Sequence, residues 1–235
     1  MNKYFQQSNH YPIPLKSVKA IIFDMDGVLV NSEPYHLVIE KELFARLDLN
    51  ISDEEHASYL GKSSIQMWNE IISNHKLNRT AEELAEINAE KIVEYFSGLN
   101  EIQTTPGIVE LLEKLYLNGI PMAVASSSDI RTIDIILSGT GLRKYFLHTV
   151  SSETVGKSKP DPKIYLYTAG LLCIKPEECM VVEDSPNGIK AAKSAGMICV
   201  AYKGVTSSEQ DHSLADEVIE DFSQMDEIMQ YYMEF

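Results

Sequence analysis

The sequence has 235 residues, a formal net charge of −15, 44% hydrophobic residues and three cysteines. Nucleic acids and anionic membranes bind Lys and Arg side chains that neutralise phosphates, so neither is expected as a partner of so acidic a chain. No apolar run reaches the roughly 18 residues of a membrane span, and the first residues lack the apolar core of a signal peptide. The cysteines form no Cys-x-x-Cys pair, which argues against a disulfide framework or a zinc cluster. We therefore expect a cytoplasmic protein.

Residues 1–17 are expected to form a loose tail. Beyond them, short apolar runs alternate with helical patterns, which is typical of an α/β fold with a parallel sheet. Thr105 and Pro106 are expected to open the helix before the second strand. The continuous apolar runs suit strands that are buried on both faces. The six candidate strands are Ala20–Phe23, Pro121–Ala125, Leu147–Ser151, Met180–Val182, Ile198–Ala201 and Val218–Ile219.

One long interval, residues 34–104, breaks this alternation. Its patterns are helical, with no convincing strand, and Ser52–Glu55 and Thr80–Glu83 have the spacing of capping boxes. The sequence thus predicts an all-helical domain inserted into a core that consists of residues 18–33 and 105–235.

Polar side chains follow four of the predicted strands, at the point where each strand ends. Because ligands of open parallel sheets bind outside the carboxyl ends of the strands, these side chains should surround one crevice. Ser128 is expected to be a helix cap or a spacer. The candidate site residues are, in chain order, Asp24 and Asp26, Ser126 and Ser127, Lys159, and Glu183 and Asp184.

This set of side chains fits phosphoryl transfer. A phosphate ester resists attack because the nucleophile and the phosphoryl oxygens are both negative, and a hard divalent cation relieves that repulsion. Asp24, Glu183 and Asp184 can supply the carboxylates that Mg²⁺ prefers. Ser126 and Lys159 can bind phosphoryl oxygens and the charge that develops on them. Asp24 is expected to attack in line and form an acyl phosphate.

Two neighbours of Asp24 complete the predicted chemistry. Asp26 can protonate the leaving oxygen and then deprotonate the hydrolytic water, and acid–base help of this kind contributes about 10²–10⁴ in rate. Gly27 allows a tight turn beside the bound phosphate.

The segments FDMDGVLVNSEP and VVEDSPNGIKAAKSAGM resemble the haloacid dehalogenase superfamily, in particular its β-phosphoglucomutase-like phosphatases with a helical cap. The similarity covers nearly the whole chain. It implies a Rossmann-like, doubly wound core in which Asp24 is the nucleophile and Asp26 the acid/base. It also implies that magnesium is held by Asp24, the Asp26 backbone carbonyl, Asp184 and, directly or through water, Glu183.

The resemblance extends to the helical insertion. His36 stands where several relatives have a hinge histidine near the leaving group, and LGKSSIQMW resembles the family's cap substrate loop. Ser64 and Leu60 replace an Arg and a Lys of the sugar phosphomutases, which weakens a mutase assignment, although Lys62 could partly substitute. The candidate substrate-binding residues are thus His36, Gly61, Lys62, Ser63 and Ser127.

The sequence therefore predicts a Mg²⁺-dependent phosphatase that hydrolyses a small phosphomonoester, a sugar phosphate, as a monomer or weak homodimer. A sugar phosphomutase is the alternative within catalysis. A noncatalytic phosphate-sensing module is the alternative from another class. Receiver domains, which also combine carboxylates, a hydroxyl and a Lys, have adjacent acidic residues and no helical cap, and the retained Asp26 argues against a silent sensor.

Overall fold

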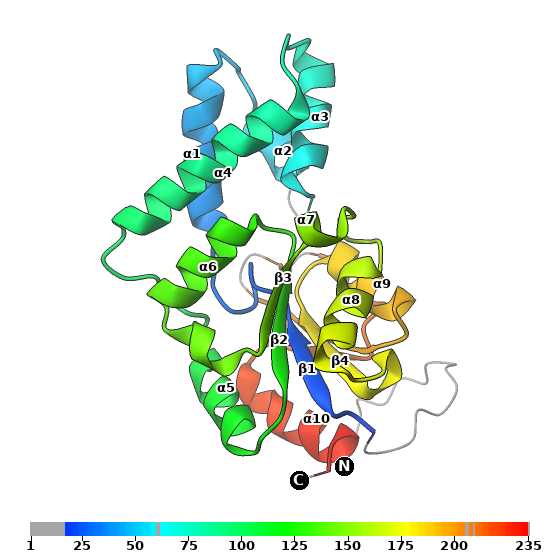
Figure 1. The fold of residues 1–235 in the computed structure, drawn as a ribbon. Helices are drawn as coiled ribbons and strands as arrows, with labels where there is room; N and C mark the ends of the chain where they lie inside the picture. The colour runs from blue at the N-terminus through cyan, green and yellow to red at the C-terminus, as the bar shows by residue number, and fades with distance from the viewer. Residues whose placement is uncertain (1–16, 60–61, 205–206, 209, 235) are drawn as a thin grey trace.

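The computed structural model describes residues 17–59, 62–204, 207–208 and 210–234. Its centre is a six-stranded sheet in the order β3-β2-β1-β4-β5-β6 (Figure 1), in which every neighbouring pair is parallel. All six predicted strands are present, and each end lies within one residue of its predicted position. The strands are β1 (Ala20–Phe23), β2 (Met122–Ser126), β3 (His148–Ser151), β4 (Cys179–Glu183), β5 (Ile198–Tyr202) and β6 (Glu217–Ile219).

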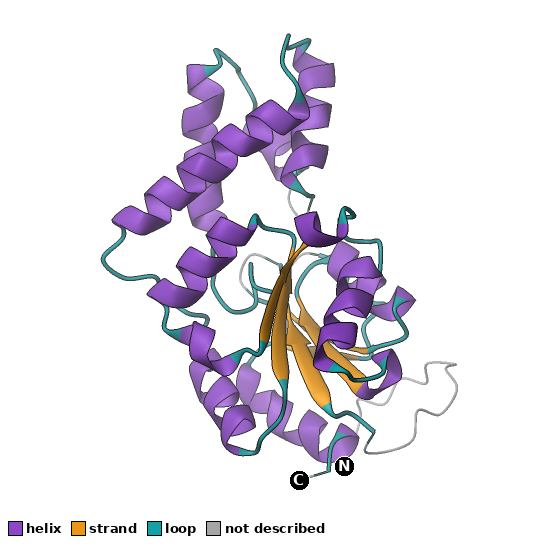
Figure 2. Cartoon of the chain, in the orientation of Figure 1, coloured by secondary structure: helices purple, strands orange, loops and turns teal. Residues whose placement is uncertain are grey.

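Helices connect the strands from β1 to β5, make up the long insertion and follow β6 (Figure 2). Within the described ranges, none of the helices has the combination of length and apolar character that crossing a bilayer requires. The helices are α1 (Glu33–Arg46), α2 (Asp53–Ala57), α3 (Ser64–His75), α4 (Ala81–Gly98), α5 (Ile108–Leu117), α6 (Ile130–Gly139), α7 (Ser152–Val155), α8 (Lys163–Leu172), α9 (Pro186–Ser194) and α10 (Met225–Tyr232).

Both faces of the sheet are buried, as the continuous apolar strands predict. Successive side chains of a strand point to opposite faces, so Ile21 and Phe23 join the core that includes α5, α6 and α10. Ala20 and Ile22 face the other way and join the core that includes α8 and α9. Helices on both faces of a parallel sheet make a doubly wound α/β fold, and the predicted fold class is confirmed.

Helices α1 to α4, which we call the cap, lie above the carboxyl edge of the sheet (Figure 1). They surround an apolar core of their own. At its centre Trp68 is fully buried and packs edge-to-face on Phe44, with ring centroids 5.7 Å apart. Ser52 and Thr80 cap α2 and α4 through one hydrogen bond each. The reciprocal capping box occurs instead at Ser63, the first residue before α3.

The helix that follows the cap, α5, begins later than the sequence predicts. Thr105 is not the N-cap of α5, because that helix begins after Gly107, whose φ of 79° is left-handed. The reason is that the segment leaving the cap pairs with the loop after β1. The Thr105 amide donates to the Leu29 carbonyl at 2.9 Å, and Thr104 forms an antiparallel bridge with Val30. The segment leaving the cap is thereby tied to the loop that leads into it.

Replacing Thr80, the N-cap residue of α4, tests what this residue contributes to the stability of the helical cap. Thr80→Ala removes the oxygen that accepts from the Glu83 amide at 3.2 Å, and we expect it to lower the free energy of unfolding by about 1 kcal/mol. Urea denaturation followed by circular dichroism measures this change. Ser97→Ala in the same helix is the matched control, because its exposed hydroxyl only donates back to the Val93 carbonyl and a bond of that kind does not stabilise a helix. Equal losses in both variants would contradict the capping account.

Candidate active site

Three neighbouring strands place polar side chains at one edge of the sheet. Strand β1 lies between β2 and β4. Asp24 follows β1 directly, and its amide donates to the Val182 carbonyl at 2.9 Å, which continues the pairing with β4. Ser126 is the last residue of β2 and Glu183 the last of β4, and both are fully buried. The predicted convergence of strand ends is therefore present in the structure.

Lys159 reaches the same point from the loop between α7 and α8. Its ammonium lies 2.5 Å from Asp24 Oδ1 and also contacts Glu183 Oε1. Burial by itself disfavours the charged ammonium, but the attraction of Asp24 and Glu183 outweighs it and raises the pKa of Lys159 above its usual range. Burial likewise works to raise the pKa of Glu183, yet Lys159 lowers it. Lys159 and Glu183 are thus a charged pair.

The remaining carboxylates experience a different balance. Burial raises the pKa of Asp24 to about 8, with Lys159 opposing and Glu183 and Asp26 adding to the rise. Burial, followed by repulsion from Glu183 and Asp24, raises the pKa of Asp184 well above its usual range. Carboxylates that are buried together in this way are unfavourable as anions unless another cation joins them.

The donor set fits a hard divalent cation. Asp24, Glu183 and Asp184 each offer a carboxylate oxygen, and these oxygens lie within 4.8 Å of one another. Oxygen ligands of this kind suit Mg²⁺. A divalent cation would also offset the excess negative charge that raises the pKa values of Asp24 and Asp184.

Asp26 is fixed by donors on both of its oxygens. Ser32 donates to Oδ1, and His36 Nε2 lies 3.5 Å from the same oxygen. Ser126 and Ser128 donate to Oδ2 at 3.2 and 2.7 Å. Burial opposes the anion, but these contacts, led by that with His36, lower the pKa of Asp26. Asp26 is therefore a well-oriented carboxylate in this arrangement.

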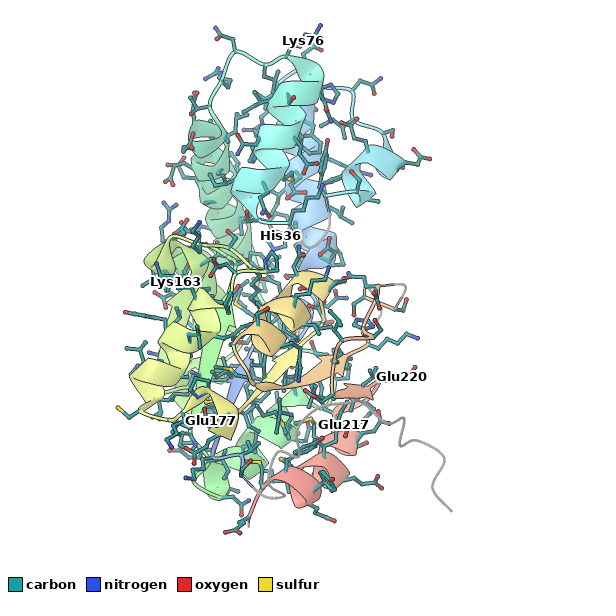
Figure 3. All side chains as sticks on the ribbon, turned by 90° about the vertical axis from the view of Figure 1, so that its right-hand side faces the viewer. His36, Lys76, Lys163, Glu177, Glu217 and Glu220 are labelled. Atoms are coloured by element: carbon teal, nitrogen blue, oxygen red, sulfur yellow. The ribbon has the colours of Figure 1, made fainter. Side chains whose placement is uncertain are left out.

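His36 connects the cap with this carboxylate. It projects from the first turn of α1 and lies where the cap meets the core (Figure 3). Burial works against its imidazolium, but the contact with Asp26 raises the pKa of His36 to about 8. The imidazolium of His36, with the hydroxyls of Ser32 and Ser128, lowers the pKa of Asp26.

The other predicted substrate-binding residues that the structure describes are Lys62 and Ser63 in the cap and Ser127, which directly follows β2. Lys62 pairs with Glu70 of α3 at 2.7 Å, and the Ser63 hydroxyl accepts from the Gln66 amide as the N-cap of α3. Ser127 is exposed. Gly61, and Leu60 before it, lie outside the described residues.

An ion pair joins the cap to the loop after β2. The Arg131 guanidinium of α6 donates to both carboxylate oxygens of Glu86 in α4, at 2.9 and 3.0 Å. It also donates to both oxygens of Asp129, the N-cap of α6. Because Asp129 directly follows Ser126–Ser128, the cap is linked to the loop that orients Asp26.

Several contacts of the site could not be predicted from the strand ends. Ser128 is neither a cap nor a spacer: Asp129 caps α6, which leaves the Ser128 hydroxyl free to reach Asp26. His212 Nε2 lies 2.8 Å from the Asp184 backbone carbonyl, and Tyr165 donates to Glu183. His212 and Tyr165 come from segments remote in sequence, and no local pattern marks them. The run of three serines after β2 was the available signal for Ser128.

Gly27 makes room for one of the carboxylates. It has a φ of 82°, and a Cβ atom placed on it would lie 2.0 Å from Asp184 Oδ2. A side chain at this position would therefore displace the Asp184 carboxylate as well as strain the backbone.

The variant Gly27→Ala tests this packing, with Gly196→Ala as the matched control. Gly196 has a similar φ of 77°, and among the described residues no atom beyond its chain neighbours lies within 4 Å of the added Cβ, so both variants carry the backbone strain of about 1–2 kcal/mol. We expect only Gly27→Ala to lose binding of Mg²⁺ in a calorimetric titration, because only there is Asp184 displaced. Equal Mg²⁺ affinity of the two variants would show that Asp184 does not need this space.

Comparison with known proteins identifies the family of this chain. The family model described as haloacid dehalogenase-like hydrolase matches residues 21–202. A β-phosphoglucomutase from Bacillus subtilis is 32% identical over 188 residues, which cover 78% of this chain and 82% of the relative. A phosphorylated carbohydrates phosphatase from Thermotoga maritima is 31% identical over 180 residues, which cover 77% and 82%. The chain spans only 18% and 53% of two longer curated relatives.

The fold is shared with solved structures. CbbY from Rhodobacter sphaeroides in complex with phosphate superposes with a TM-score of 0.81 at 26% identity, over 88% of this chain and 96% of that one. The match to the hydrolase family model and the relatives that are named phosphatases confirm the predicted enzyme class, a phosphoric monoester hydrolase. The chain belongs to the haloacid dehalogenase-like hydrolase family, in its β-phosphoglucomutase-like group with a helical cap.

Proposed function

We propose that this protein is a Mg²⁺-dependent phosphatase that hydrolyses a small sugar phosphate through a phosphoryl group carried on Asp24. The observation that carries the proposal is the contact of 2.5 Å between Asp24 and the buried Lys159 ammonium, in a cluster of carboxylates at the sheet edge. An ammonium in that position can stabilise charge on the phosphoryl oxygens while the carboxylate beside it attacks phosphorus.

Hydrolysis takes two steps, and Asp24 is the nucleophile of the first and the leaving group of the second. One of its carboxylate oxygens bonds to phosphorus as the bond to the leaving oxygen breaks, which gives an acyl phosphate and an alcohol. Water then attacks phosphorus, the bond between phosphorus and the Asp24 oxygen breaks, and inorganic phosphate leaves. Ser126 and Lys159 bind the phosphoryl oxygens during both steps.

Asp26 moves the proton that each step requires. It gives a proton to the leaving oxygen and then takes one from the attacking water. Because its neighbours hold it as a carboxylate, it must acquire the proton when substrate binds. A phosphate dianion beside it favours this change, since a nearby like charge raises the pKa of a carboxyl.

Asp24, Asp184 and the Asp26 backbone carbonyl would hold Mg²⁺, with Glu183 beside them. Bound there, the ion would neutralise the carboxylates and the phosphoryl oxygens, which otherwise repel one another. The increase in the pKa of Asp24 and Asp184 through burial supports a cation at this place.

The substrate class follows from the cap and from the relatives. Residues 34–104 are proposed to close over a small polar phosphate and exclude water, with His36 near the leaving group and Gly61, Lys62, Ser63 and Ser127 as further contacts. A relative named for phosphorylated carbohydrates supports a sugar phosphate. The monomeric or weakly dimeric state and the cytoplasmic location remain predictions from the sequence.

A sugar phosphomutase is the second candidate, because a β-phosphoglucomutase is among the relatives. A mutase must hold a second phosphate while its intermediate reorients. Ser64 stands where the mutases carry an Arg, and Lys62 is paired with Glu70. These two features favour hydrolysis.

Phosphate release from a panel of compounds tests the proposal. The panel contains sugar phosphates, phosphoglycolate, nucleotides and pyrophosphate, each assayed with Mg²⁺ and with EDTA. We expect release from a sugar phosphate that requires Mg²⁺ and that falls by about 10³-fold or more in Asp24→Asn, because the nucleophile is gone. Asp134→Asn, at an exposed position on α6, is the matched control and should keep full activity.

Two results would overturn the phosphatase. Conversion of glucose 1-phosphate to glucose 6-phosphate without phosphate release would assign the mutase. Binding of a compound by the folded protein without turnover of any member of the panel would favour the sensing module.

A further inference from the structure

Tyr165 is a polar side chain enclosed beneath the active site. It lies on α8 and is 0% exposed. Its hydroxyl donates to Glu183 Oε1 at 2.8 Å, and the Lys159 ammonium lies 5.1 Å from the centroid of its ring. One side chain from outside the strand ends thus contacts both members of the charged pair. Tyr165 has no part in the chemistry proposed above.

The contacts of Glu183 show what the tyrosine hydroxyl adds. Oε1 accepts from Lys159 and Tyr165. Oε2 accepts from the amides of Asp184 and Ser185 at 2.9 and 3.0 Å and from the Ser185 hydroxyl at 3.1 Å. A carboxylate has about four lone-pair sites, and protein donors already fill them. Glu183 is thereby held in one orientation and is suited to anchoring Lys159.

We propose that Tyr165 is a positioning residue of this enzyme. Its hydroxyl fixes the Glu183 carboxylate, and its ring supports the ammonium of Lys159 through a cation–π contact. Both contacts aim the ammonium at Asp24, where the phosphoryl group is bound and transferred. This inference rests on the proposed function, because it assigns to Lys159 the binding of phosphoryl oxygens.

The position of Tyr165 explains why an anchor is needed. A lysine side chain is long and flexible, and it reaches the site from a loop rather than from a strand. Glu183 is held in place at the end of β4, but a single carboxylate does not by itself fix the position of a flexible ammonium. A ring on one side and an anion on another restrict the ammonium to the direction of Asp24.

Tyr165→Phe removes the hydroxyl and keeps the ring and its packing. We expect it to weaken the binding of inorganic phosphate, measured by calorimetry with Mg²⁺ present, by roughly 10- to 100-fold, the range for one hydrogen bond to a charged group. The value of kcat/KM should fall by a similar factor. The affinity for Mg²⁺ alone should stay unchanged, because Glu183 retains its other donors. Tyr165→Leu should lose more phosphate affinity, because the ring contact with Lys159 is also removed.

Thr168→Val is the matched control. Thr168 is also fully buried on α8, but its hydroxyl donates only to the Ile164 carbonyl of the same helix. The positioning role requires that Thr168→Val binds phosphate as the unmodified protein does. Unchanged phosphate affinity in Tyr165→Phe, or an equal loss in Thr168→Val, would overturn the proposal.

A result that contradicts the proposed function can be distinguished from one that contradicts the role of Tyr165. If the unmodified protein releases no phosphate from the panel, the phosphatase is wrong, but the calorimetric comparison still decides the role of Tyr165. Weaker phosphate binding by Tyr165→Phe would then support the positioning role, and equal binding would contradict it.

Discussion

The buried ammonium of Lys159 between two carboxylates is the interaction on which the active site depends. Burying Asp24 or Glu183 alone would cost several kcal/mol, and Lys159, in contact with both, offsets much of that cost. Asp26 and Asp184 add more negative charge than Lys159 can neutralise. The pKa of Asp184 rises, whereas the pKa of Asp26 falls because His36, Ser32 and Ser128 donate hydrogen bonds to it. Ionising Asp24 and Asp184 together is therefore unfavourable without a further cation, which favours a divalent cation at this place and, with it, a phosphate.

The topology of the sheet makes this concentration of charge possible. With β1 between β2 and β4, Asp24, Ser126 and Glu183 are brought together by backbone pairing alone, without long side chains. The surrounding elements then supply what the strands cannot. Gly27 leaves space for Asp184, and α1 brings His36 to Asp26. A rigid sheet holds the groups that react, and the helices add contacts that orient them.

The sequence predicted the strands and the convergence of their ends because both depend on local patterns and on the rule that parallel strands share a carboxyl edge. The partners of each side chain were beyond such rules. Tyr165 looks like an ordinary apolar-face residue of α8, and its hydroxyl acquires Glu183 as a partner only when α8 packs on the face of the sheet along β1, β2 and β3. The start of α5 was misplaced for a similar reason, since Thr105 pairs with Leu29 across the cap connection. Local capping signals cannot include that tertiary hydrogen bond.

The central claim is that Asp24 carries the phosphoryl group, and trapping that group on the chain tests it most directly. The protein would be mixed with Mg²⁺ and its best substrate, quenched in acid during turnover, digested, and analysed by mass spectrometry with and without hydroxylamine, which cleaves acyl phosphates. The account predicts a hydroxylamine-sensitive phosphoryl group on Asp24, formed during turnover and absent when substrate is omitted. Turnover with a phosphoryl group on another residue, or with none on the chain, would contradict it.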